Sequence, residues 1–132
     1  MLGRPTPGVR SGDTADMATA EDVRELALRL PETTEKPSYG TPGFRVKDRL
    51  FARLRKDPDA LVIWSEEKEP LITAEPAKFF TTPHYDGYPM VLVRIEAVDR
   101  PELGELLTDS WRLRGPKRLV ADFESGGGTV PS

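Results

Sequence analysis

The stretch FRVKDRLFARLRKDPDALVIWS, residues 44–65, decides the fold of this chain. It contains three runs in which apolar residues dominate or alternate with charged ones, as is typical of short strands. The runs cover residues 44–47, 50–55 and 61–65. The two connectors between them are short enough to join antiparallel neighbours. The sequence therefore predicts an antiparallel meander of three strands.

A second strand signal lies further along the chain, in TPHYDGYPMVLVRI, residues 82–95. Asp86-Gly87 predicts a tight turn, because Gly accepts a positive φ and Asp can hydrogen-bond its own backbone. Residues 90–95 then predict a strand rich in β-branched side chains. Phe79 and Phe80 predict the start of another strand before the turn.

A helix is predicted before the meander. Thr19, followed three residues later by Asp22, resembles a capping box, and apolar residues at helical spacing continue to Pro31, which ends the helix. The segment at residues 31–42 is rich in Pro, Gly, Thr and Ser. We therefore expect it to be an ordered loop that leads into the meander.

More helices follow the meander. A short helix is expected within residues 68–78. Asp99 predicts the cap of a longer helix, and Pro116 predicts the start of a final helix over residues 117–123. The expected order is helix, three strands, short helix, two strands and two helices. This order indicates an α+β fold in which helices flank an antiparallel β-sheet.

Length and composition are those of one globular domain. The chain has 132 residues, of which 37% are hydrophobic and 31% charged. We expect the domain to span residues 17–124, with disordered segments at residues 1–16 and at the Gly/Ser tail, 125–132. The sequence has no apolar run of membrane-spanning length, no secretory h-region at its start and no cysteine. These features predict a cytoplasmic protein that does not enter membranes. We expect it to be a monomer or a weak dimer.

Four stretches of the sequence resemble, in order and spacing, the MmcQ/YjbR family of small bacterial proteins. They are SYGTPGFRV (38–46), LFARL (50–54), FFTTPHYDGYPMVLVRI (79–95) and SWRLRGPKRLV (110–120). The resemblance implies a CyaY-like α+β fold. It also implies DNA binding, because that fold is likened to a double-wing arrangement. The sequence departs from the family pattern at Lys47-Asp48-Arg49, where relatives often turn with Gly, and at residues 1–16, which have no recognised counterpart.

Basic residues form the strongest charge pattern. Arg45 alternates with Lys47 along one predicted strand, and Arg53 with Arg55 along the next, so each pair can project from one face of the sheet. Such a hairpin can follow the phosphate backbone of DNA. The candidate contact residues, including a second cluster near the last helices, are Arg45, Lys47, Arg49, Arg53, Arg55, Arg112, Arg114, Lys117 and Arg118. Since the formal net charge is −3, the alternative is an ordinary solvated surface.

Aromatic residues indicate a second possible function, the binding of a small molecule for sequestration or resistance. The candidate pocket residues are Tyr39, His84, Tyr85, Tyr88 and Trp111. His84 beside Asp86 is also a candidate general base, but no activated nucleophile accompanies it, so catalytic residues are not predicted. The alternatives are that His84 only fixes the turn and that Trp111 belongs to the core.

No cofactor or metal site is predicted. One His and no Cys are too few for a zinc site, and the three glycines of the tail lack the strand and helix of a phosphate-binding loop. Frataxin-type relatives of the implied fold bind iron through acidic surface residues, for which the candidates here are Glu66, Glu67, Glu69 and Glu75. Exposed carboxylates without a cage bind hard cations weakly.

Overall fold

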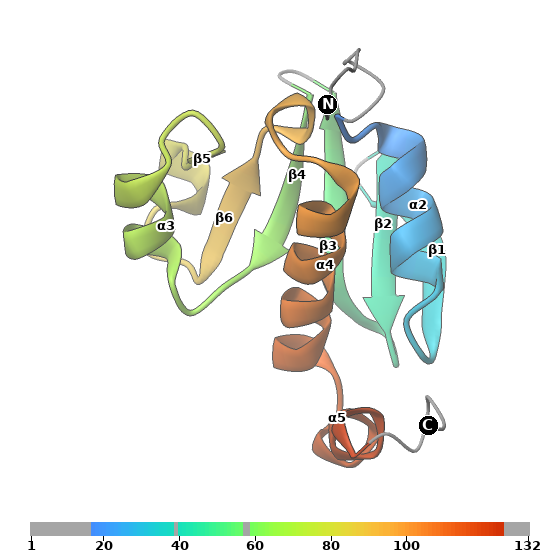
Figure 1. The fold of residues 1–132 in the computed structure, drawn as a ribbon. Helices are drawn as coiled ribbons and strands as arrows, with labels where there is room; N and C mark the ends of the chain where they lie inside the picture. The colour runs from blue at the N-terminus through green and yellow to red at the C-terminus, as the bar shows by residue number, and fades with distance from the viewer. Residues whose placement is uncertain (1–16, 39, 57–58, 126–132) are drawn as a thin grey trace, which may run out of the picture.

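The computed structural model describes residues 17–38, 40–56 and 59–125, which Figure 1 shows in colour. The elements are α2 (Ala20–Leu28), β1 (Thr33–Ser38), β2 (Thr41–Val46), β3 (Arg49–Lys56), β4 (Asp59–Trp64), α3 (Lys68–Ala74), β5 (Phe79–Phe80), the 3₁₀ turn η2 (Pro83–Tyr85), β6 (Met90–Val93), the 3₁₀ turn η3 (Ile95–Ala97), α4 (Arg100–Arg114) and α5 (Lys117–Glu124). The segment expected to be disordered at 1–16, and all of the one expected at 125–132 except Ser125, lie outside the described residues.

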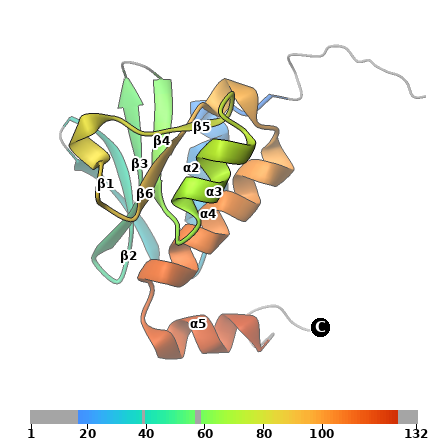
Figure 2. The same ribbon diagram turned by 90° about the vertical axis from the view of Figure 1, so that its left-hand side faces the viewer.

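The six strands form one antiparallel sheet in the order β1-β2-β3-β4-β6-β5. Strands β1 to β4 are consecutive neighbours, so they form the predicted meander with one strand more. Figure 2 shows α3 and α4 on one side of this sheet and η2 on the other. The predicted α+β fold, with helices flanking an antiparallel sheet, is confirmed.

The prediction of a loop over residues 31–42 is wrong, because β1 and the start of β2 lie there. The sequence of β1, TTEKPS, has little intrinsic strand preference. It is a strand because all six of its residues pair with β2. As an edge strand, β1 tolerates Pro37, which has no N–H to offer a second neighbour. The sheet therefore has six strands rather than the five expected.

The turn between β2 and β3 forms without glycine. Lys47 and Asp48 have φ values of 49° and 71°, the left-handed region that a tight two-residue hairpin turn requires. Asp enters this region more readily than most residues, whereas a Lys there is uncommon. The departure from the family pattern at this position thus leaves the hairpin intact.

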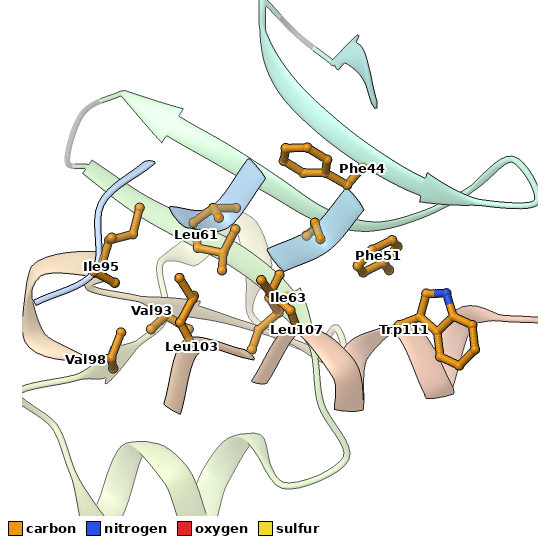
Figure 3. Close-up of a cluster of buried hydrophobic side chains, with 14 of the residues drawn as sticks. Phe44, Phe51, Leu61, Ile63, Val93, Ile95, Val98, Leu103, Leu107 and Trp111 are labelled. Atoms are coloured by element: carbon orange, nitrogen blue, oxygen red, sulfur yellow. The ribbon is translucent and has the colours of Figure 1, made fainter. Parts of the chain in front are cut away.

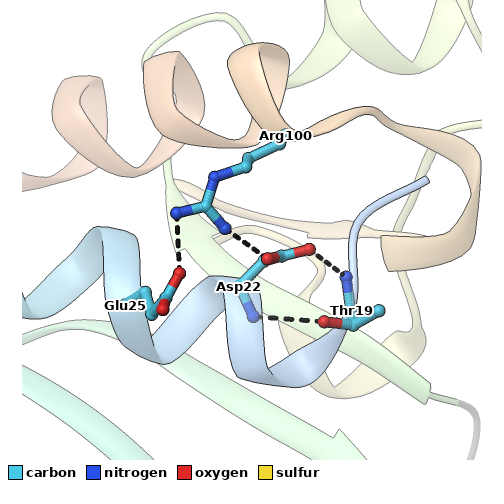
Figure 4. Close-up of polar contacts among 4 residues, drawn as sticks. All are labelled: Thr19, Asp22, Glu25 and Arg100. Carbon is cyan, nitrogen blue, oxygen red and sulfur yellow. Dashed lines mark hydrogen bonds and ion pairs between the residues drawn. The ribbon is translucent and has the colours of Figure 1, made fainter. Parts of the chain in front are cut away.

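The predicted cap of α2 is confirmed, and Figure 4 shows its reciprocal bonds. The Thr19 hydroxyl accepts a hydrogen bond from the Asp22 N–H at 3.2 Å, and the Asp22 carboxylate accepts one from the Thr19 N–H at 3.0 Å. Arg100, the first residue of α4, then pairs with Asp22 and, at 2.7 Å, with Glu25. These contacts connect the start of α4 to the first turns of α2.

The main core lies between the sheet and the helices, and Figure 3 shows part of it. Phe44, Phe51 and Ile63 come from the meander, and Leu107 and Trp111 meet them from α4. Each of these side chains is at most 1% exposed. Burial of large side chains stabilises a domain by roughly 1.5–3 kcal/mol each, so this layer is the main source of stability.

Ser110 joins α4 to the sheet where the ladder between β3 and β4 ends. That ladder reaches Ala52↔Ile63 and stops. The Ser110 hydroxyl bridges the next two backbone groups: it donates to the Phe51 carbonyl at 2.5 Å and accepts from the Trp64 N–H at 2.9 Å. A buried hydroxyl thus takes the place of one ladder bond. None of the helices in the described part of the chain has the length and apolar character to cross a membrane.

Candidate nucleic-acid interface

The side of the sheet away from α2 and α4 carries a continuous row of paired residues. Strand pairing links one residue of each strand in the order Lys36, Gly43, Arg53, Val62, Leu92 and Phe80. Directly paired residues project from the same side of an antiparallel sheet. Their neighbours along the strands, such as Phe44 and Ile63, point into the main core instead.

Four basic residues of the described parts of strands β1 to β3 lie on this side, which we call the open face and define by Lys36, Arg45, Arg53 and Arg55. Arg45 lies two residues after Gly43, the partner of Lys36, and Arg55 lies two residues after Arg53. Residues two apart on a strand project from the same side of the sheet. None of the described strand residues at open-face positions is acidic. Glu35, the acid of β1, lies on the helix side and pairs with Arg24 of α2 at 2.8 Å. The acid of β1 thus lies on the side opposite to the four basic residues, while Asp48 of the β2–β3 turn pairs with Lys36 at 4.0 Å.

A β-bulge sends Arg49 to the other side. The pairing shifts between Phe44↔Ala52 and Arg45↔Leu50, so Phe51 is an extra residue in β3. Strict alternation would place Arg49 with Arg53, but after the bulge Arg49 pairs with the buried Val46. The hairpin arginines therefore do not all share one face, which the sequence alone could not indicate.

Arg53 is held in place on the open face. Its guanidinium donates to the Tyr85 hydroxyl oxygen at 2.6 Å and to the Thr41 hydroxyl oxygen at 3.3 Å. Tyr85, only 6% exposed, belongs to a small apolar cluster with Val62 and Leu92 of the sheet. The structure therefore brings one residue of the predicted DNA-binding hairpin into contact with one of the predicted pocket.

The segment that carries Tyr85 lies on the open side of the sheet, and hydrogen bonds hold it before and after the Asp86-Gly87 turn. The predicted turn is confirmed: Gly87 has φ of 84°, and the Tyr88 N–H donates to the Tyr85 carbonyl at 3.1 Å. Lys68 donates to the carbonyls of Tyr85 and Tyr88 at 2.7 and 3.0 Å. His84 is exposed and lies edge-on to Tyr85, with ring centroids 4.7 Å apart. Tyr88 is 57% exposed.

The predicted aromatic pocket is not assembled. Trp111 has no exposed surface, lies in the main core on the helix side, and donates from Nε1 to the Pro31 carbonyl at 3.0 Å. The sheet separates it from Tyr85 and His84. Tyr39 lies outside the described residues. Trp111 is therefore a core residue, as the alternative interpretation held. The ring contact of His84 is with Tyr85, which is not an activated nucleophile.

The second basic cluster lies near the junction of α4 and α5, and two of its residues, Arg112 and Arg114, are engaged within the protein. Arg112 pairs with Asp109 at 2.9 Å and with Glu124 at 2.8 Å. Arg114 lies over the Trp64 ring at 4.6 Å. Burial, and then repulsion from the nearby Arg49, lower the pKa of Arg114 below its usual value.

The remaining candidates of this region are more exposed. Arg49 and Lys117 border, with Arg112, a shallow hollow of about 470 Å³. Arg118 is exposed on α5. Lys47, at the hairpin turn, pairs with Glu32 at 3.7 Å. We call Arg49, Arg112, Arg114, Lys117 and Arg118 the junction cluster.

Metal ligands do not converge in the parts of the chain that the structure describes, where no three His, Cys, Asp or Glu side chains could hold an ion together. The acids considered for iron are exposed, and Glu75 pairs with Lys78 at 2.8 Å. Lys36 is the open-face residue that sequence reasoning missed, because it lies in the segment expected to be a loop. In the sequence, Lys36 is a single basic residue in a polar stretch, and nothing there indicates a strand.

Together, the fold and this surface define a class: an α+β protein whose antiparallel sheet has helices on one side and a basic open face on the other. Comparison with known sequences adds the family. The YjbR family model matches residues 28–113, so the chain belongs to the YjbR family. The resemblance to MmcQ/YjbR proteins is thereby confirmed.

Similar proteins are known both as sequences and as a solved structure. Uncharacterized proteins Rv2570 of Mycobacterium tuberculosis and Mb2600 of Mycobacterium bovis are 37% identical over 132 residues, which covers 85% of this chain and all of each relative. The crystal structure of Deinococcus radiodurans protein DR2400, with a DUF419 domain, matches with a TM-score of 0.62 and 28% identity. That match covers 74% of this chain and 78% of the other.

Proposed function

We propose that this protein binds nucleic acid through the open face of its sheet, mainly by contacts to phosphates. The observation that carries the proposal is the grouping of Lys36, Arg45, Arg53 and Arg55 on one side of β1 to β3, with no acid at the described strand positions of that side. A protein with a formal net charge of −3 does not attract polyanions as a whole. A local basic surface is therefore required.

The spacing of a sheet suits a row of phosphates. Side chains two residues apart on a strand are separated by roughly 6.7 Å, and neighbouring strands by about 4.8 Å. Guanidinium groups bind phosphate oxygens with two parallel hydrogen bonds. The guanidinium of Arg53 already has a defined orientation before binding, because it is hydrogen-bonded to Tyr85 and Thr41. Ordering it on binding therefore costs less conformational entropy.

The expected readout is affinity without base specificity. Contacts to phosphates position a protein but carry no sequence information. The open face lacks a helix for the major groove, since the described helices lie on the opposite side or at the end of the sheet. We therefore expect duplexes of different sequence to bind with similar affinity.

The test measures binding by fluorescence anisotropy over a series of salt concentrations, with a labelled duplex and the matching single strand. Four phosphate contacts predict a slope of log K against log salt of about −3.6 for duplex DNA and about −2.8 for single strands. Absence of binding to either form at low salt would overturn the proposal.

Two double variants with equal loss of charge locate the surface. Lys36→Gln with Arg45→Gln removes two charges from the open face, so the slope for duplex DNA should become less steep by about 1.8. Lys117→Gln with Arg118→Gln is the matched control on α5, where both residues are exposed. The control should leave the slope unchanged. A larger loss in the control than in the open-face variant would assign binding to the junction cluster and refute the open-face site.

A further inference from the structure

A second concave feature lies at the end of the sheet beside the first turn of α2. It is a hollow of about 450 Å³, which we call the α2 hollow, and its apolar lining comes from Ala18, Ala20, Pro42, Leu54 and Ile95. These residues belong to four separate parts of the chain, so only the folded domain forms the hollow. Volumes of roughly 300–1,000 Å³ with mainly apolar walls are usual for small-molecule sites.

The two charged residues of the lining differ in their surroundings. Arg55 is half-buried, whereas Glu96 is exposed to solvent. A charge that is partly removed from water interacts more strongly with a ligand than one that water screens. The hollow thus favours a negative group near Arg55 over a positive group near Glu96.

From this we infer that the α2 hollow binds a small amphipathic carboxylate, with its apolar part against Leu54 and Ile95 and its carboxylate facing Arg55. A guanidinium and a carboxylate form short, charge-assisted hydrogen bonds. The site shares Arg55 with the open face, whereas Lys36, Arg45 and Arg53 do not border it. It also differs from the predicted aromatic pocket, none of whose described residues lines it.

The test is a competition assay on the full chain. The fluorescent probe 8-anilinonaphthalene-1-sulfonate, an apolar molecule with one negative charge, is bound first. Decanoate, decanol and decylamine then compete for it, since they share one chain but carry a negative, no and a positive charge. Decanoate should displace the probe at a concentration about tenfold lower than decanol, the effect of one charge-assisted hydrogen bond. Decylamine should be the weakest competitor.

Two variants place this binding in the α2 hollow. Ala20 is exposed at the first turn of α2, so Ala20→Phe can fill the hollow without altering the core. It should weaken probe and decanoate by at least about tenfold. Arg55→Gln should reduce decanoate to the affinity of decanol and leave decanol unchanged. The matched controls are Ala74→Phe, exposed on α3, and Arg94→Gln, over the Phe80 ring at the far edge of the sheet, and both should bind normally.

Thermal unfolding of each variant establishes that it is folded before binding is compared. The inference is overturned if the probe does not bind, or if decanoate and decylamine compete equally. It is also overturned if folded Ala20→Phe binds as the parent protein does.

Discussion

Removing the Ser110 hydroxyl should destabilise the domain far more than its size suggests. Ser110 has no exposed surface, and its oxygen bridges the Phe51 carbonyl and the Trp64 N–H. Ser110→Ala leaves a buried N–H without a partner, which costs about 1–3 kcal/mol, and removes a bond worth about 0.5–1.5 kcal/mol at the carbonyl. We expect a loss of about 3 kcal/mol from a total of roughly 5–15 kcal/mol.

The assay is unfolding in urea, monitored by tryptophan fluorescence, with a thermal melt as a second measure of stability. A loss of this size lowers Tm by at least roughly 10 °C in a domain of about 100 residues. Thr108→Ala is the matched control, because Thr108 lies in the same helix and donates only to the Gly104 carbonyl of its own helix, at 2.8 Å. It should change stability by less than about 0.5 kcal/mol.

The reasoning would be refuted if Ser110→Ala and Thr108→Ala unfolded at the same urea concentration with equal m-values. That result would mean that the two backbone groups find other partners and that the bridge between helix and sheet contributes nothing. An unchanged m-value in both variants is required for the comparison, since it shows that the surface exposed on unfolding is the same.

Three further changes have definite expectations. Trp111→Phe removes a fully buried indole and its N–H bond, and chemical unfolding should show a loss of about 2–3 kcal/mol; a loss under about 1 kcal/mol would contradict the core packing. Gly87→Ala strains a residue at φ of 84°, so unfolding should become easier by about 1 kcal/mol, and no change would show that the turn relaxes. Arg100→Gln removes partly exposed pairs with Asp22 and Glu25, so calorimetry should show a small loss of stability that shrinks further in high salt, and a loss that salt leaves unchanged would contradict an electrostatic cause.

The candidate surface illustrates why sequence and structure must be combined. Alternation along β3 correctly placed Arg53 and Arg55 on one side. It could not place Arg49, because a single extra residue at the bulge reverses the side for everything before it. It also missed Lys36, whose strand exists only through pairing with β2. The aromatic candidates were separated for a similar reason, since Trp111 and Tyr85 lie on opposite sides of the sheet.

Local chemistry determined much of this protein directly. The caps at Thr19 and Asp99, the turn at Gly87 and the apolar runs of β3, β4 and β6 depend on residues close in sequence, so each could be recognised without coordinates. Through them the sequence predicted the α+β class and the meander.

Tertiary structure alone decided which side chains meet. Strand β1, the bulge, the bond between Arg53 and Tyr85 and the α2 hollow all join residues that are distant in the chain. Their formation depends on the pairing of strands and the packing of layers, whose energies come from contacts that no local pattern encodes. The side of the sheet on which a basic residue lies, and with it the proposed function, is therefore a property of the folded domain.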